Sequence, residues 1–311
     1  MIRTIWKDIQ PTEAGHAQCH EHIWLEKGAS YEVNPALCMN DYVKSLRELK
    51  DYCRAGGRLI VDAQPTGCGR NAQTLAALSR ESSVFIVAAA GFHKKEFFDD
   101  TALFSLPEDT LAALYAKEIE EGIPGSGQES SPYRAGILKA AADGDWQEDP
   151  VYRKLFEAVA QAAVQTGAPV MIHTEKGNDI PGLIRWFEER GIPPKKLLIC
   201  HLDRTHYDIG YHREVLSAGC YLSYDSIHRL KYVSEAEETE LLLAMKESGF
   251  TGQIMLSLDT TNQRLRSYCA EDMGLDYILK TFIPELKEHG FTDREIRQMC
   301  ITNAAALLDF V

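Results

Sequence analysis

Six residues of types that bind metal ions each stand at the end of a short apolar run. They are His20, His22, Lys139, His173, His201 and Asp259. Burying an imidazole or a carboxylate is costly unless the group is paired or bound to a metal, so its recurrence at one relative position needs a common cause. One metal site assembled from several strands supplies that cause.

The histidines and the aspartate suit two metal ions. His20 and His22 are two residues apart, which places both imidazoles on one side of an extended strand. Two histidines bonded to the backbone would give the same spacing. His173 and His201 suggest a second pair. Asp259 could bind a metal and accept a proton from an attacking water, or it could cap the following helix.

Lys139 is the unusual member of the set, because metal ions would repel an ammonium group. The apolar residues on either side of it favour burial over an ordinary solvated lysine. Desolvation lowers the pKa of a lysine, and the free amine can react with carbon dioxide to give an anionic carbamate that bridges two metals. The alternative is a surface lysine at the end of a strand.

The elements that must position these residues alternate along the chain. Strands are predicted at 17–22, 58–63, 84–90, 135–139, 169–173, 197–201, 219–224 and 253–259. Helices are predicted at 41–49, 71–80, 107–121, 150–166, 182–190, 212–218, 235–248 and 273–289. This pattern predicts a (β/α)8 TIM barrel, with a doubly wound open sheet as the rival. Ligands from five strands converge only if the sheet closes, which favours the barrel.

Composition narrows the class of protein. The 311 residues, 45% of them hydrophobic, show no linker and predict a single domain over 1–311. A net charge of -13 argues against a nucleic-acid or anionic membrane surface and leaves a small molecule as the expected partner. The N-terminus shows no export signal, so a cytoplasmic location is expected. Eight cysteines without a CxxC pair are read as reduced and structural.

Over essentially its full length the chain resembles the phosphotriesterase-like branch of the amidohydrolase superfamily. The resemblance rests on Cys19-His20-Glu21-His22, Val61-Asp62-Ala63-Gln64-Pro65-Thr66, Ala90-Gly91-Phe92-His93, Gly136-Ile137-Leu138-Lys139, His173-Thr174-Glu175, His201-Leu202-Asp203, Ser257-Leu258-Asp259 and Ile301-Thr302-Asn303-Ala304. It also implies a homodimer.

The resemblance assigns roles to the six residues. It implies that His20, His22 and Asp259 hold a buried metal and that His173 and His201 hold an outer one. Carboxylated Lys139 bridges the two ions, which are expected to be zinc, with manganese or cobalt as substitutes. The implied reaction is hydrolysis by a hydroxide between the metals, with Asp259 moving the proton.

The loops must select among lactones, carboxyl esters and phosphotriesters. Lys94 and Lys95 after the third strand, and Arg204 after the sixth, depart from organophosphate-hydrolysing relatives. The histidine that such relatives use after the seventh strand is displaced or missing. Efficient phosphotriester hydrolysis is therefore not expected.

Cationic residues gather in the last two strand-end loops. Lys231, Arg264, Arg266 and Tyr268 are predicted to bind a phosphate, as in the phosphorylated sugar lactonases of the family. Solvated charges paired with nearby glutamates are the alternative. The predicted enzyme opens a phosphorylated sugar lactone. The alternatives are a phosphotriesterase-like esterase or lactonase acting on unphosphorylated or N-acyl substrates, and a catalytically silent metal-binding protein.

Overall fold

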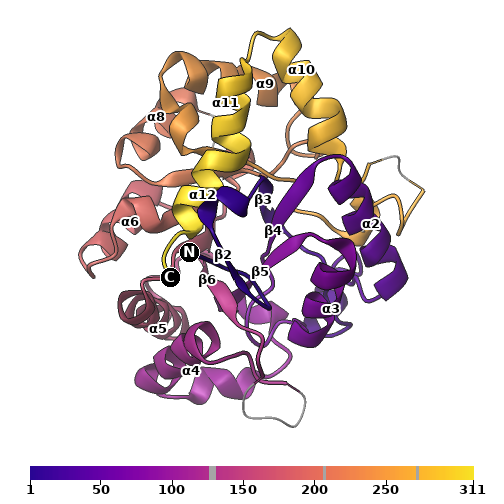
Figure 1. Cartoon of the computed structure of the whole chain (residues 1–311). Coiled ribbons are helices and arrows are strands. Elements are labelled where there is room, and N and C mark those ends of the chain that lie inside the picture. Colours follow the sequence, from indigo (N-terminus) through magenta and orange to yellow (C-terminus); the bar gives the residue numbers. More distant parts are fainter. Residues whose placement is uncertain (126–130, 206–207, 271–272) are drawn as a thin grey trace.

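The computed structural model describes residues 1–125, 131–205, 208–270 and 273–311. Eight parallel strands form one sheet in the order β10-β9-β8-β7-β6-β5-β4-β3. They are β3 (His16–Glu21), β4 (Gly57–Asp62), β5 (Phe85–Gly91), β6 (Ala135–Ala141), β7 (Val170–His173), β8 (Leu197–Cys200), β9 (Tyr221–Tyr224) and β10 (Ile254–Leu256). The eight predicted strands and the (β/α)8 barrel are confirmed (Figure 1).

The barrel closes between β3 and β10 largely through side chains. The Ser257 hydroxyl accepts from the backbone N–H groups of Cys19 and His20, at 2.9 and 3.1 Å. The buried Glu21 carboxylate accepts from the N–H of Leu258 at 2.7 Å. One backbone bond, from Asp259 N to His20 O at 3.1 Å, completes the seam. The last strand therefore ends at Leu256, earlier than predicted, because the chain beyond it turns to bond with β3.

Helices surround the sheet, and most begin where a polar side chain accepts a backbone N–H. Asp41, Asn71, Asp149, Asp179, Asp208 and Ser234 cap helices in this way. The helices that follow these caps are α2 (Tyr42–Arg54), α3 (Ala72–Ser82), α5 (Pro150–Thr166), α6 (Ile180–Glu188), α8 (Ile209–Ser217) and α9 (Glu235–Glu247). Capping by Asp208 makes α8 start earlier than the predicted residue 212.

The described residues form further helices. They are α1 (Ala29–Val33), α4 (Glu108–Glu120), α7 (Leu202–Thr205), α10 (Ile283–Glu288), α11 (Asp293–Arg297) and α12 (Asn303–Leu308). A π-helical turn at Ile278–Phe282 leads into α10, so the predicted helix 273–289 begins later than expected. In the part of the chain that the structure describes, no helix has the length and apolar character needed to cross a bilayer.

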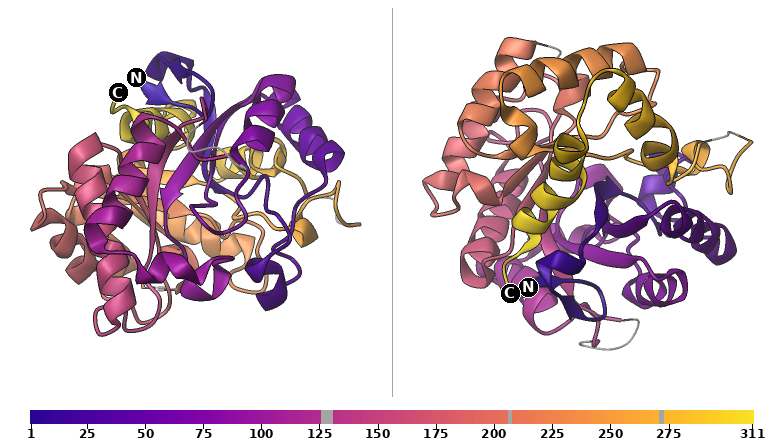
Figure 2. Two further views of the ribbon diagram at one scale, coloured as in Figure 1. Left: turned by 90° about the horizontal axis from the view of Figure 1, so that it is seen from below. Right: turned by 45° about the horizontal axis from the view of Figure 1, so that its top comes forward.

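The two chain ends seal the bottom of the barrel. A short hairpin of β1 (Ile2–Arg3) and β2 (Asp8–Ile9), absent from the sequence prediction, lies with α12 across the ring (Figures 1 and 2). Ile2, Ile9, Leu307 and Leu308 join the interior side chains of the strands in one apolar cluster. This plug leaves the opposite, C-terminal end of the strands as the place for a site.

Gly91 allows β5 to lie against β6. Its φ is +95°, and a Cβ at this position would overlap the backbone oxygen of Lys139. We expect Gly91→Ala to lower the free energy of unfolding by about 3 kcal/mol or more, because the strain of a positive φ in alanine adds to the overlap of its Cβ with the Lys139 oxygen.

Gly56→Ala is the matched control, since Gly56 has φ +107° and open space around the position of a Cβ. Chemical denaturation compares the two variants. Equal losses of stability in the two variants would show that the positive φ alone, without the contact with β6, explains the need for glycine at position 91.

Candidate metal centre and adjoining pockets

The six predicted residues converge at the C-terminal end of the barrel. His20 lies on β3 and His22 just beyond it, Lys139 on β6, His173 at the end of β7, His201 after β8 and Asp259 after β10. All six side chains are buried. His201 and Asp259 have positive φ values of 69° and 49°, conformations that cost energy in non-glycine residues and concentrate at functional sites.

His20, His22 and Asp259 form one potential ligand group. The Nε2 atoms of His20 and His22 lie 3.7 and 3.5 Å from Asp259 Oδ1. These separations are long for hydrogen bonds. Two ligands bound at about 2.1 Å in a tetrahedral arrangement around one ion lie about 3.4 Å apart, so the geometry fits a shared metal.

His173 and His201 form a second group, held by a carboxylate that the sequence analysis did not assign. His201 Nε2 lies 2.8 Å from His173 Nδ1, and His201 Nδ1 lies 2.6 Å from Asp225 Oδ1. The other oxygen of Asp225 is 3.3 Å from His20 Nδ1. Asp225 thus fixes the ring of His201 and lies against His20. It directly follows the apolar strand β9, the same signal that identified the other residues.

Lys139 has the environment that its proposed modification requires. Its side chain is fully buried, and Nζ has no hydrogen-bond partner among the described residues. Burial lowers its pKa, which favours the free amine. Its charge also contributes, after burial, to lowering the pKa of His20 to about 4. An unpaired amine among neutral imidazoles fits a lysine that becomes an anionic bridging ligand.

His93 is a further histidine of the site to which the sequence analysis gave no role. It follows β5, is buried, and its ring centroid lies 5.0 Å from that of His173. Burial and then the charge of Lys139 keep its pKa well below the usual value. The neutral ring therefore adds no charge to the centre.

Two arginines hold the outer oxygen of Asp259. Arg204 Nη1 donates to Oδ2 at 2.8 Å, and Arg229 Nη1 donates to the same oxygen. Burial alone would raise the pKa of Asp259, but Arg229 and Arg204 hold it well below its usual value. The carboxylate therefore keeps its charge, with Oδ1 facing the histidines. Sequence reasoning noted Arg204 but not its contact with Asp259.

Two pockets adjoin at this end of the barrel. The inner pocket, about 160 Å³, is bordered by the four histidines and Asp259, and by His93, Gln64 and Tyr232. The outer pocket, about 220 Å³, is lined by Asn34, Ala36, His228, Arg229, Leu230, Lys231, Thr261, Gln263 and Arg264. Asn34, Arg229, Lys231 and Thr261 border both. A ligand in the outer pocket therefore lies next to the histidine cluster.

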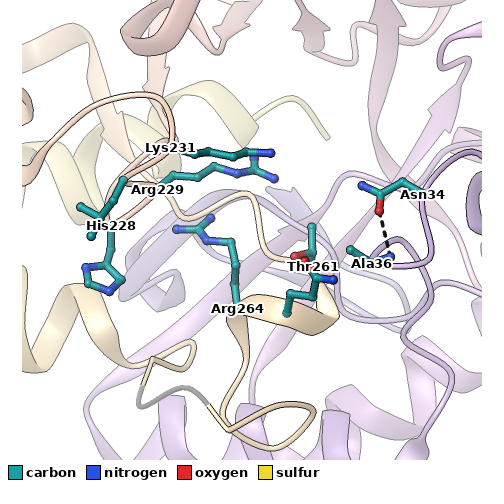
Figure 3. A pocket seen from close by; sticks show the side chains of 9 residues that line it. Asn34, Ala36, His228, Arg229, Lys231, Thr261 and Arg264 are labelled. Carbon is teal, nitrogen blue, oxygen red and sulfur yellow. Dashed lines mark hydrogen bonds between the residues drawn. The ribbon is translucent and has the colours of Figure 1, made fainter.

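The four predicted phosphate-binding residues separate into two groups. Lys231 borders both pockets and Arg264 the outer one, where Figure 3 shows them beside Arg229. The guanidinium of Arg264 already donates to the carbonyl oxygens of Leu258 and Ile227.

Arg266 and Tyr268 border neither pocket. Arg266 pairs with Asp276 at 2.7 Å, and the Tyr268 hydroxyl bonds to Ser45 at 2.7 Å and to the Asp41 carbonyl at 2.9 Å. The bonds of Tyr268 tie the loop after β10 to the start of α2, and the Arg266–Asp276 pair is formed within the segment that follows β10. Adjacency in sequence to Arg264 therefore did not bring Arg266 and Tyr268 into the pocket.

The barrel and its histidine centre define a metal-dependent hydrolase of lactone or ester substrates. A family model described as the phosphotriesterase family matches residues 1–308, and the chain belongs to this family, whose members use a binuclear metal centre.

Relatives of known activity or structure match almost the whole chain. A phospho-furanose lactonase of Mycoplasmopsis agalactiae is 27% identical over 99% of this chain and 91% of its own. An N-acetyltaurine hydrolase of Danio rerio is 26% identical over 99% and 98%. The crystal structure of a lactonase from Listeria monocytogenes has a TM-score of 0.90 at 30% identity and covers 100% of this chain and 99% of that one.

Asp225 provides a test of the histidine geometry. We expect Asp225→Asn to weaken metal affinity by about 10–100-fold, because the carboxylate orients His201 and faces His20. Competition with a chelator measures the change. Glu48→Gln is the control, since Glu48 is a buried carboxylate that bonds to the backbone of Ser267 and Leu275, away from the histidines. An affinity lowered equally in both variants would contradict the orienting role.

Proposed function

We propose that the protein opens a phosphorylated sugar lactone at a binuclear metal centre. The observation that carries this proposal is the cationic outer pocket, which contains Arg229, Lys231 and Arg264 and shares residues with the pocket of the histidine cluster. In a chain of net charge -13, cations concentrated beside the reaction centre favour an anionic substrate. The phospho-furanose lactonase and the Listeria lactonase among the similar proteins support the same class.

The six converging residues are the proposed metal ligands. His20, His22 and Asp259 would hold the buried ion, and His173 and His201 the outer one. Lys139, as a carbamate, would bridge them. Zinc suits nitrogen and carboxylate ligands, and manganese or cobalt are possible replacements. Bound ions supply an activated water and polarise the carbonyl oxygen of the substrate.

The protein groups around the centre would set its geometry and move the proton. Asp225 orients His201 through the bond to Nδ1. Arg204 and Arg229 occupy Oδ2 of Asp259, which leaves Oδ1 on the side of the histidines. We propose that Asp259 accepts the proton released when water attacks the lactone. As the bond between the carbonyl carbon and the ring oxygen breaks, Asp259 passes this proton to the ring oxygen, which becomes a hydroxyl; the new carboxylic acid then ionises to a carboxylate and releases a proton to solvent.

We propose that Lys231 and Arg264 bind the phosphate, with Arg229 as a third cation. No carboxylate of the described residues lies within ion-pair distance of Lys231, so its charge is available to a ligand. Arg264 contributes charge rather than free donors, because both its Nη atoms bond to backbone oxygens. Arg266 and Tyr268, proposed from sequence, would act indirectly by holding the loop after β10.

A second candidate is hydrolysis of an N-acyl substrate that carries an anion. Arg204 and Arg229 border the inner pocket itself, so an anionic group could lie closer to the metal centre than a sugar phosphate places it. The N-acetyltaurine hydrolase among the relatives supports this class.

We further propose a cytoplasmic homodimer; the eight free cysteines agree with a reducing compartment.

Matched aldonolactones with and without a terminal phosphate test the proposed substrate. The metal-loaded enzyme should strongly prefer the phosphorylated lactone, as followed by acid release with a pH indicator. Lys231→Gln should raise KM for that lactone by about 10–100-fold with little change in kcat, because the phosphate is remote from the reacting carbon.

Arg266→Gln is the comparison, because it removes a cation that lies outside the pockets. A large increase in KM for Arg266→Gln, without one for Lys231→Gln, would indicate that the phosphate binds at Arg266 and not at Lys231. Equal turnover of the two lactones would leave only a general metal-dependent hydrolase, and preference for an N-acyl sulfonate or carboxylate would select the second candidate.

Lys139 gives a test of the metal centre. Lys139→Ala and Lys139→Met, the second of which leaves less empty space, should each lose bound metal, as measured by elemental analysis. Activity should fall by more than about 100-fold, which exceeds the loss expected when a residue that only orients a metal ligand is removed. Carbon-13 NMR of wild-type enzyme supplied with labelled bicarbonate should show a carbamate signal. Two metals retained per chain in both variants would refute the bridging role.

A further inference from the structure

Asn34 lies on the wall of the outer pocket opposite its cations. It follows α1 and borders both pockets, and Figure 3 shows its side chain facing the space toward which Arg229 and Lys231 extend. We propose that the amide Nδ2 of Asn34 donates a hydrogen bond to a phosphate oxygen of the substrate and thereby helps to select phosphorylated lactones. This inference rests on the proposed function and adds a residue that determines specificity.

The orientation of the amide follows from its backbone contact. Asn34 Oδ1 accepts from the N–H of Ala36 at 3.0 Å, a turn typical of asparagine. A backbone N–H can bond only to an acceptor, so the oxygen must occupy this position and Nδ2 must take the other. No described residue bonds to Nδ2. A donor with no protein partner is therefore presented to the pocket (Figure 3).

The loop that carries Asn34 is fixed to the cationic wall. Asn262 Nδ2 donates to the carbonyl oxygens of Pro35 and Cys38, at 2.9 and 3.0 Å, and Asn262 N donates to Ala36 O at 3.1 Å. Asn262 lies between Thr261, which borders both pockets, and Arg264. These three bonds hold the two walls at a set separation, so Asn34 need not be ordered when a ligand binds.

The cations of the outer pocket use part of their donors within the protein. Both Nη atoms of Arg264 bond to backbone oxygens, and Arg229 Nη1 bonds to Asp259. The ammonium of Lys231 and the other nitrogen atoms of Arg229 remain as donors on the cationic wall. A phosphate monoester presents three terminal oxygens, and a neutral amide on the facing wall supplies a donor without added charge. A sugar hydroxyl could also accept a hydrogen bond from Nδ2. Unlike a phosphate oxygen, however, a hydroxyl can also donate to an acceptor at residue 34, and a variant with only acceptors there distinguishes the two groups.

Asn34→Asp is the informative variant because it keeps the acceptor for Ala36 and replaces only the donor with an anionic oxygen. A phosphate would be repelled, whereas a sugar hydroxyl would donate to the new carboxylate. We expect the ratio of kcat/KM for the phosphorylated lactone to that for the unphosphorylated lactone to fall by more than tenfold, about the worth of one hydrogen bond to a charged group. Asn34→Ala, which removes the donor and adds no charge, should lower the ratio less.

A binding measurement separates this inference from the proposed reaction. Calorimetric titration of the metal-loaded protein with a pentose 5-phosphate should show weaker binding to Asn34→Asp and Asn34→Ala than to wild type. Melting temperature and metal content establish that each variant is folded. Gln263→Glu, which adds a negative charge at another residue lining the outer pocket, controls for charge alone.

The possible results have distinct meanings. Unchanged selectivity and probe affinity in Asn34→Asp would overturn the role of Asn34 and leave the proposed function intact. An effect of Gln263→Glu equal to that of Asn34→Asp, with none from Asn34→Ala, would overturn the hydrogen bond in favour of general repulsion. If wild type binds the probe and the variants do not, the inference stands even if the lactone assay assigns another reaction. Failure of wild type to bind the probe would reject it.

Discussion

The structure depends on the compensation of polar groups buried at one end of a closed barrel. Four histidines, a lysine and an aspartate are buried there, each with less than a tenth of its surface exposed. Hydrogen bonds within the protein satisfy some of them, but Lys139 Nζ has no partner among the described residues, and the Nε2 atoms of His20 and His22 lie 3.7 and 3.5 Å from Asp259 Oδ1, beyond ordinary hydrogen-bond distance. Such an arrangement is costly without an ion to bind these atoms, so the centre is better understood as a metal site than as a polar core.

The contacts that close the barrel also assemble the histidine–aspartate centre. The chain carrying Asp259 leaves β10 and bonds to β3, so the carboxylate is delivered to His20 and His22 by the same contacts that close the sheet. Glu21, between the two histidines in sequence, contributes its carboxylate to that seam. Burial raises the pKa of Glu21 to about 8, although its bonds to Leu258 and Thr260 oppose the shift.

The cations around the pockets have two different functions. Arg204 and Arg229 neutralise and orient Asp259, and Arg264 bonds to backbone oxygens, so these guanidinium groups are already part of the folded structure. Among the described residues, no carboxylate lies within ion-pair distance of Lys231. The proposed ligand would therefore meet a preorganised positive field, with Lys231 and Asn34 as its proposed direct contacts.

The sequence by itself determined the barrel and the six converging residues, because apolar runs of strand length recur in strict alternation with amphipathic segments and each of these residues stands at the end of such a run. Local chemistry also fixed most helix starts, since a capping side chain acts within three residues. The N-terminal hairpin and the seam between β3 and β10 escaped prediction, because they depend on contacts between the two ends of the chain.

Only the tertiary structure decided the partners of the charged loops. Arg264, Arg266 and Tyr268 are close in sequence, yet only Arg264 reaches the outer pocket, because Asp276, Ser45 and Asp41 hold the other two elsewhere. The contact of Asp225 with His201 and that of Arg204 with Asp259 join residues that are far apart in the sequence. A strand pattern specifies which end of the barrel a residue occupies, whereas the direction of a long side chain is settled by groups distant in sequence.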